Sequence, residues 1–185
     1  MMAAYLSWYM NPGAKKQHLT VLELVLFAML GALTFALKWA MSWLPNIEPV
    51  SLMVMLFGVI FGWKALYPIY LYVGLEILFY GIGTWNICYL YVWAILLVAA
   101  ILLRKVQMPL VWALVSAGFG LFFGALCGIV DVFLFGLPYA LTKWASGIPY
   151  DVAHCVGNFV IALILFVPLR RLMEKLYAKL TRKNA

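Results

Sequence analysis

The sequence predicts an all-α integral membrane protein, a six-transmembrane-helix bundle with both termini cytoplasmic. Its composition points to a membrane protein, because 68% of the 185 residues are hydrophobic and only 10% are charged. A soluble domain would carry about a quarter charged residues, and the mean hydropathy here is +1.04. We expect one membrane domain over 1–185, with a cytoplasmic tail at 1–19, the six-helix bundle at 20–169 and a basic cytoplasmic tail at 170–185.

The first predicted helix begins near Thr20 and extends to about Leu44. Thr20 and Glu23 have the spacing of a capping box, in which the two residues satisfy the first backbone N–H groups of a helix. The segment Pro45-Asn46-Ile47-Glu48-Pro49 then forms a rigid polar break, since two prolines exclude a regular helix through it. We expect no cleaved signal peptide in 1–18, which lacks a short apolar core with a small-residue cleavage site.

The second apolar run, Val50 to Phe61, is short for a membrane crossing, which needs roughly 20 residues. It is either part of a re-entrant hairpin or a short helix buried among the others. Gly62-Trp63-Lys64 makes a tight turn after it, and the third run extends from Ala65 to Tyr80.

The remaining runs are long enough to span. The fourth extends from Trp85 to Leu103 and ends at Arg104-Lys105. The fifth extends from Pro109 to about Phe135, and we expect a loop from Gly136 to Gly147. The sixth extends from Pro149 to Pro168 and is followed by a basic, amphipathic tail from Arg170 to Lys183.

The distribution of basic residues orients the bundle. With both termini inside, the cytoplasmic side would hold Lys15, Lys16, Lys64, Arg104, Lys105, Arg170, Arg171, Lys175, Lys179, Arg182 and Lys183. Only Lys143 would lie outside, with Lys38 within the first span, so the positive-inside rule selects this orientation. The net charge of +7 therefore reflects topology, with attraction to anionic lipid as a secondary effect, and predicts no nucleic-acid partner.

Polar and aromatic residues gather at the predicted outer ends of the helices. Apolar walls with a few placed polar groups are the composition of a small-molecule pocket. The candidate substrate-binding residues are Asn46, Glu48, Trp85, Asn86, Tyr89, Lys143, Trp144, Asp151, His154 and Asn158.

Four residues of the sixth helix form the most informative pattern. Asp151, His154, Cys155 and Asn158 fall at i, i+3, i+4 and i+7, which is one stripe of a helix. A polar stripe is costly against lipid, so we expect it to face protein, water or a ligand.

Each residue also has a purely structural alternative. Asp151, just after Pro149, could cap the start of its own helix. His154 could be a core histidine bonded to Asp151, and Asn158 could join two helices. Tryptophan and tyrosine near helix ends are often interfacial belt residues.

Glu76 lies inside the third apolar run, with Tyr72 and Tyr80 at i−4 and i+4. Lys38 is the basic residue inside the first run. We expect these two to form a structural ion pair, because an unpaired charge at that depth costs about 2.5–3.5 kcal/mol or more.

The sequence gives little sign of catalytic or metal chemistry. Cys88, Cys127 and Cys155 lie in apolar surroundings without a CxxC pair, so we expect neither a disulfide framework nor a zinc site, and no metal or cofactor. GxSxG, HExxH and phosphate-loop motifs are absent from the sequence. Two alternatives to solute binding stay open: a membrane scaffold or assembly protein, and an intramembrane enzyme that uses His154.

Two further features carry a family resemblance. Ala28, Ala32 and Ala36 keep a four-residue spacing, with Gly31 beside them, and small residues on one stripe let another helix approach closely. The segment Asn46-Ile47-Glu48-Pro49-Val50-Ser51 follows the first helix. Together with size and topology, these features resemble the substrate-binding S components of energy-coupling factor (ECF) vitamin transporters, over essentially Leu22 to Leu172.

The resemblance implies an expected function. An S component in a prokaryotic plasma membrane captures a vitamin or related micronutrient from outside. It then joins a membrane coupling subunit and two ATPase subunits, which hydrolyse ATP, so this chain would not itself be an enzyme. The alanine stripe would contact the coupling subunit, and Pro45 to Pro49 would act as a lid.

The resemblance leaves the substrate open, because substrate residues vary within the family. The aromatic residues suit a planar ring. Lys143 could meet a carboxylate or phosphate, whereas Glu48, Asp131 and Asp151 could meet an amine or amide. A cobalamin-type ligand, with His154 or Cys88 reaching cobalt, is one further option.

Overall fold

The computed structural model describes residues 19–44 and 46–182. The predicted tail at 1–18, Pro45 and the end of the chain from Lys183 lie outside the described residues, and with them Lys15, Lys16 and one residue of the expected lid. In the described part every element is helical. The elements are α2 (Val21–Ala40), α3 (Val50–Phe61), η1 (Gly62–Ala65), α4 (Leu66–Tyr80), α5 (Thr84–Leu103), α6 (Pro109–Leu121), α7 (Phe123–Phe135) and α8 (Leu137–Arg182).

Within the described residues, five helical stretches are long and apolar enough to cross a membrane. They are Val21–Ala40, Val50–Tyr80, Thr84–Leu103, Pro109–Phe135 and Leu137–Leu180. The predicted count of six differs because α3, η1 and α4 follow one another without a break and form one stretch of 31 residues. The prediction of an all-helical chain with several helices long and apolar enough to cross a membrane is confirmed for the described residues.

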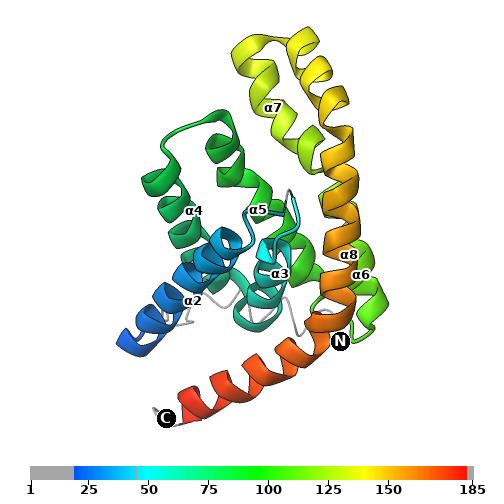
Figure 1. Cartoon of the computed structure of the whole chain (residues 1–185). Coiled ribbons are helices and arrows are strands. Elements are labelled where there is room, and N and C mark those ends of the chain that lie inside the picture. The colour runs from blue at the N-terminus through cyan, green and yellow to red at the C-terminus, as the bar shows by residue number, and fades with distance from the viewer. Residues whose placement is uncertain (1–18, 45, 183–185) are drawn as a thin grey trace, which may run out of the picture.

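The stretch from α3 to α4 is bent at η1. Gly62, at the end of α3, has φ +59°, a left-handed backbone conformation that glycine adopts without strain. The chain turns back there at the lower end of the molecule (Figure 1). At 12 and 15 residues, α3 and α4 are about 18 and 22 Å long, each less than the roughly 30 Å of a bilayer core.

Helix α3 lies at the centre of the bundle and α2 at its edge. Every residue of α3 from Val50 to Gly58 is buried, whereas α2 buries only Phe27, Gly31 and Thr34. Close approach depends on small residues, as membrane helices require. A Cβ on Gly31 would lie 2.7 Å from the Pro68 carbonyl oxygen of α4.

The fifth predicted helix is broken near its middle. Helix α6 ends at Leu121 and α7 begins at Phe123, with Phe122 at φ −97° and ψ 5° between them. The prediction of one continuous helix from Pro109 to about Phe135 therefore missed a break at Phe122.

The predicted loop from 136 to 147 is helical from Leu137 onwards, and only Gly136 separates it from α7. Helix α8 begins at Leu137 and continues for 46 residues, about 69 Å, with Pro149 and Pro168 inside it. Figure 1 shows α8 descending beside α6 and then turning across the lower end. Proline interrupts the helical hydrogen bonds and is a regular cause of such bends. The predicted start at Pro149, and the predicted boundary between bundle and tail, both fall inside this helix.

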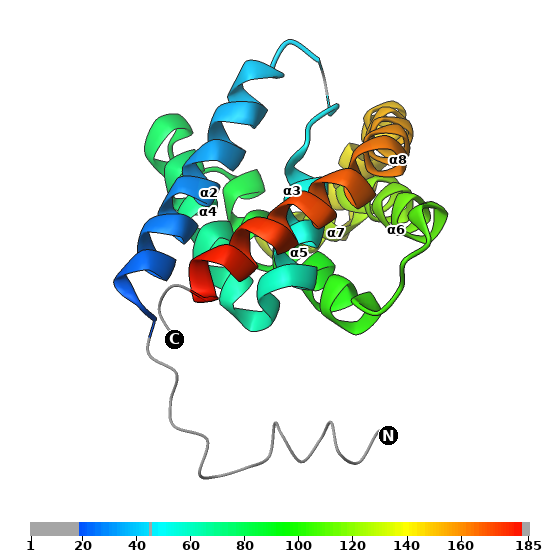
Figure 2. The same cartoon turned by 90° about the horizontal axis from the view of Figure 1, so that it is seen from below.

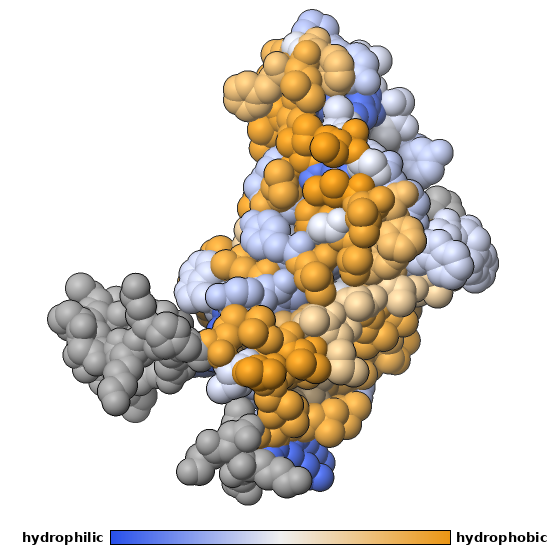
Figure 3. Space-filling model, turned by 90° about the vertical axis from the view of Figure 1, so that its left-hand side faces the viewer, coloured by the Kyte–Doolittle hydropathy of each residue, from blue (hydrophilic) through white to orange (hydrophobic). Residues whose placement is uncertain are grey.

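The outer surface of the bundle is strongly apolar. Large exposed side chains on neighbouring helices include Met29, Leu78, Phe79, Leu102 and Phe133. Figure 3 shows broad hydrophobic areas on the face that is on the left in Figure 1. Exposed apolar surface on this scale fits a protein that spans a membrane several times.

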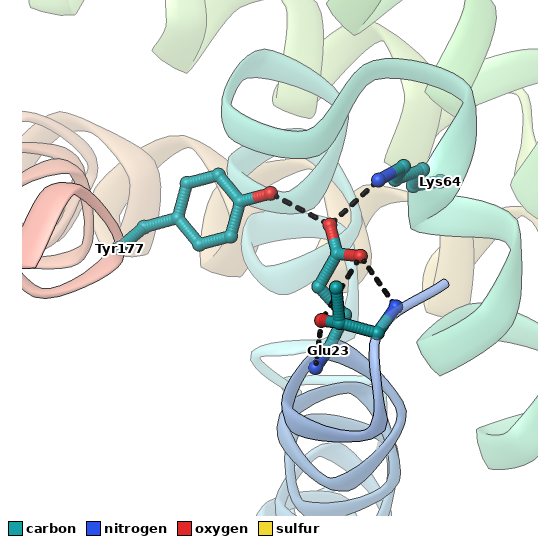
Figure 4. A network of polar contacts seen from close by, with 4 residues as sticks. Glu23, Lys64 and Tyr177 are labelled. Atoms are coloured by element: carbon teal, nitrogen blue, oxygen red, sulfur yellow. Dashed lines mark hydrogen bonds and ion pairs between the residues drawn. The ribbon is translucent and has the colours of Figure 1, made fainter. Parts of the chain in front are cut away.

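Polar contacts join three helical segments at the lower end of the molecule. Glu23 completes the predicted capping box with Thr20, and its Oε1 also accepts hydrogen bonds from Lys64 Nζ at 2.6 Å and the Tyr177 hydroxyl at 3.1 Å (Figure 4). One carboxylate therefore joins the start of α2, η1 and the last part of α8. Seen from below in Figure 2, α8 crosses under the bundle towards α2.

The Glu23 network predicts a stability difference between two matched variants. Glu23→Gln removes a charged acceptor shared by two donors, so unfolding should become easier by about 1.5–3 kcal/mol, or roughly 3–12 °C in Tm. Glu174→Gln removes the exposed end of an i,i+4 pair with Arg170, at 2.8 Å, and should cost about 0.5 kcal/mol or less. Thermal unfolding in detergent measures both, and equal losses would contradict the role of the network.

Candidate functional site

A cavity of about 250 Å³ opens on the upper side of the molecule, between α5, α7, α8 and the loop before α3. We define the upper side by that loop, the turn at 81–83 and the α7–α8 junction. Five of the predicted substrate residues line the cavity: Asn46, Trp85, Lys143, Trp144 and Asp151. The lining also includes Thr84, Phe123, Gly124, Cys127, Gly128, Asp131, Gly147 and Tyr150.

Asp151 is a buried carboxylate in the wall of this cavity. It is 4% exposed, and its Oδ1 accepts a hydrogen bond from the Gly124 backbone N–H at 3.0 Å. Its Oδ2 has no partner at hydrogen-bond geometry, although the indole N–H of Trp144 interacts with the same carboxylate. The prediction that Asp151 caps its own helix is wrong, because α8 begins at Leu137. Asp151 instead caps the first turn of α7 from a neighbouring helix.

Gly124 allows this contact. A Cβ built on Gly124 would lie 2.5 Å from Asp151 Oδ2 and 2.9 Å from Oδ1. Any larger residue would therefore push the carboxylate out of its place in the cavity wall.

Lys143 is not available as a free cation. Its Nζ lies 2.8 Å from Asp131 Oδ1, and both residues line the cavity. The expected role of Lys143 as a partner for a substrate carboxylate or phosphate would require this pair to open. Together the two side chains add no net charge to the site.

The loop before α3 covers one side of the cavity. Asn46 has φ +56°, a conformation that asparagine tolerates better than most residues, and its Nδ2 donates to the Tyr150 carbonyl at 3.3 Å. Ile47 packs over Gly157, where a Cβ would lie 3.2 Å from it. The loop is thus held against α8 by one hydrogen bond and one small-residue contact.

Behind Trp85 lies the ion pair predicted between Lys38 and Glu76. Lys38 Nζ is 2.7 Å from Glu76 Oε2 and 3.2 Å from the Tyr89 hydroxyl, and Glu76 is fully buried. The ammonium also lies 5.3 Å from the Trp85 ring and 5.0 Å from the Tyr89 ring, within the range of cation–π attraction. The prediction of a structural ion pair is confirmed.

Glu48 is the second carboxylate near Lys38. Lys38 and Glu76 both interact electrostatically with it. Burial, opposed by the positive charge of Lys38, leaves the pKa of the Glu48 carboxyl above its usual value. Glu48 does not line the cavity itself.

An aromatic network connects this cluster to His154. Tyr89, Trp93 and Phe123 contact one another, and Phe123 lies 5.0 Å from the His154 ring. His154 is 2% exposed, and neither ring nitrogen has a hydrogen-bond partner. Phe123 therefore contacts His154 and also lines the cavity, whereas His154 does not line it.

Unpaired buried polar atoms are concentrated here. In the described part of the chain seven buried side-chain atoms lack a hydrogen-bond partner, on Tyr72, Glu76, Asn86, Trp93, Asp151 and His154. All six residues belong to the upper or middle parts of α4, α5 and α8. Buried polar groups normally have a hydrogen-bond partner. Such a cluster is therefore typical of a place where a bound solute or water supplies the missing partners.

Asn86 and Asn158 have structural roles. Asn86 Oδ1 accepts from the Gly83 N–H at 2.9 Å, which caps the start of α5. Asn158 Nδ2 donates to Ser51 Oγ at 3.0 Å and to the Ser116 carbonyl at 3.1 Å, and so joins α8 to α3 and α6. The structural alternative for Asn158 is confirmed: this end of the stripe faces protein, whereas Asp151 at the other end lines the cavity.

The cysteine prediction is wrong for two of the three residues. Cys88 of α5 and Cys127 of α7 form a disulfide, and Cys155 is free. Cys127 lines the cavity, so the bond fixes α7 beside α5 at the edge of the site. The option that Cys88 reaches a cobalt ion is excluded while this bond exists.

The predicted docking stripe lies on the open face of α2. Ala28, Ala32 and Ala36 are all exposed, whereas Gly31 faces α4. No other described helix covers these three alanines.

Comparison with known proteins identifies no relative. The chain matches no known family model, no curated protein sequence and no solved structure.

The Lys38–Glu76 pair predicts a marked contrast between a single and a double variant. Lys38→Met leaves Glu76 as a buried charge without a cation, which should destabilise the fold by about 3–5 kcal/mol. Lys38→Met combined with Glu76→Gln removes both charges and should be much closer to the original stability. Unfolding in detergent compares them; a double variant as unstable as the single one would contradict the pairing.

Proposed function

We propose that this chain is the substrate-binding S component of an ECF-type importer in a prokaryotic plasma membrane. It captures a vitamin-like micronutrient from outside and passes it to a membrane coupling subunit with two ATPase subunits. The observation that carries the proposal is the cavity on the upper side, which adjoins a cluster of buried polar atoms without partners. Apolar walls with a few unsatisfied polar groups are what a small-molecule site provides.

The proposed topology has six crossings, with α3 and α4 as separate short spans and α6 and α7 as one. The lower side is cytoplasmic in this arrangement. Basic residues of η1, the turn after α5 and the end of α8 support it, since positive charge is enriched in cytoplasmic loops. The Cys88–Cys127 disulfide supports it independently, because disulfides persist in oxidising surroundings such as the outer side of a plasma membrane.

Coupling would use the open face of α2. The exposed alanines allow the backbone of a partner helix to approach closely. Their exposure in the isolated chain is what a docking helix needs, and lipid would cover them before the partner binds.

Cysteine labelling tests the topology. In a Cys155→Ala background, Thr142→Cys on the upper side should react with a membrane-impermeant maleimide in intact cells. Gln107→Cys, in the turn after α5, should react only after permeabilisation, because the proposed topology places it in the cytoplasm. Labelling of Gln107→Cys in intact cells would reverse the orientation.

Co-purification tests the function and the docking face together. Ala32→Leu adds bulk where helices should meet, at a cost of about 1–3 kcal/mol, so recovery of the coupling subunit and ATPases should fall roughly tenfold or more. Gly74→Leu is the matched control, since Gly74 is exposed on α4 and a Cβ there meets nothing within 4 Å. Both variants should retain a small molecule that is released on denaturation.

The outcomes separate the proposed function from its alternatives. A preparation that recovers no ATPase and releases no small molecule from cells grown in rich medium would refute the transporter role. Recovery of another membrane protein in its place would favour the scaffold alternative. Uptake that persists in variants whose cavity-lining residues are replaced would show that this cavity is not the substrate-binding site.

A further inference from the structure

Within the described residues, the ion pairs leave two carboxylates without a cationic partner at hydrogen-bond distance. The sequence has six acidic residues. Four of them form ion pairs in the described structure: Glu23 with Lys64, Glu76 with Lys38, Asp131 with Lys143, and Glu174 with Arg170. The two that remain, Glu48 and Asp151, both lie on the upper side, on a chain whose net charge is +7.

The ionisable side chains that line the cavity leave one carboxylate without a counter-ion. Its charged lining residues are Asp131, Lys143 and Asp151, and the first two neutralise each other at 2.8 Å. Asp151 is left as the uncompensated charge. This result does not depend on Glu48, which lies behind the cavity wall near Lys38.

Asp151 is placed to receive a positive group. It is more than nine-tenths buried, it lines the cavity, and its Oδ2 has no hydrogen-bond partner. Its Oδ1 is fixed by the Gly124 N–H, so the carboxylate is held in position before any ligand arrives. A pre-positioned acceptor loses little conformational entropy on binding.

The neighbouring walls are aromatic. Trp85, Phe123 and Trp144 line the same cavity as Asp151. Aromatic faces attract both planar rings and organic cations. An anionic ligand would bind more weakly, because the ammonium of Lys143 is already paired with Asp131 and the Asp151 carboxylate would repel the ligand.

We propose that the substrate is a small organic cation with a planar ring, whose positive group pairs with Asp151 Oδ2 while its ring lies against the aromatic walls. This substrate class rests on the proposed function, since it assigns a ligand to the same cavity. It selects the amine option among those that the sequence left open. A free carboxylate or phosphate on the ligand is disfavoured at this position.

Three indoles of nearly equal size and different charge test the proposal. Tryptamine is a cation at neutral pH, tryptophol is neutral and indole-3-propionate is an anion. Calorimetry with the full chain in nanodiscs of zwitterionic lipid, corrected with empty nanodiscs, gives the three affinities. Tryptamine should bind about tenfold or more tightly than tryptophol, as a charge-assisted hydrogen bond predicts, and indole-3-propionate should bind most weakly.

Two variants assign the preference to Asp151. Asp151→Asn keeps an oxygen for the Gly124 N–H, so the fold should survive, but it should reduce tryptamine binding about tenfold and leave tryptophol within about twofold. Lys143→Gln makes the cavity more negative and should leave tryptamine binding equal or tighter. Asp151→Asn should leave the unfolding temperature unchanged, which would show that it does not act through stability. Lys143→Gln leaves the buried Asp131 without its cation and should lower the unfolding temperature, so binding is measured well below that temperature.

The possible failures are distinguishable. Saturable binding that favours the anion, or that ignores charge, would overturn the cationic substrate class and leave the solute site intact. Tryptamine binding that survives Asp151→Asn would overturn the role of Asp151. Failure of all three indoles to bind at millimolar concentration would count against the cavity as a solute site, and with it against the proposed function.

Discussion

A charge buried among apolar helices must be paired, and the contact between Lys38 and Glu76 meets this demand at the edge of the bundle. The two side chains lie 2.7 Å apart and join α2 to α4. Helix α2 buries only three residues, so the close approach at Gly31 near its middle and this pair in its last turn are main attachments of the helix. Because α2 is held along that one side, its alanine stripe on the other side stays open.

The same demand is met differently at the two ends of the molecule. On the lower side, Glu23 accepts from two donors besides its own helix cap, and Arg170 binds Glu174 and two backbone carbonyls of the turn after α5. Polar groups there are satisfied by the protein. On the upper side, buried donors and acceptors of α4, α5 and α8 lack partners. A fold that pairs its polar groups at one end can do so at the other, and this asymmetry supports the proposal that the upper side binds a ligand.

Local patterns predicted the parts of this structure that depend on local chemistry. The Thr20–Glu23 cap follows from spacing along one helix, and the Lys38–Glu76 pair follows from the cost of leaving either charge alone. The Cys88–Cys127 bond joins residues 39 positions apart and depends on α5 and α7 being neighbours, which no local pattern reveals. Pro149 suggested the start of a helix, but membrane helices tolerate internal proline because neighbouring groups satisfy the freed carbonyl. Half of the predicted site residues line the cavity, and the pairing of Lys143 with Asp131 appears only when the α7–α8 junction brings them together.

The break between α6 and α7 and the carboxylate in the cavity are two aspects of one arrangement. In an unbroken helix, the Gly124 N–H would bind the carbonyl four residues earlier, at Gly120. The break at Phe122 places Gly124 in a first turn, where backbone N–H groups lack partners within the helix. Asp151 Oδ1 satisfies that N–H, and the absence of a side chain at Gly124 lets the carboxylate approach. An interrupted helix therefore supplies the donor that holds Asp151 in the cavity wall, while its second oxygen has no hydrogen-bond partner.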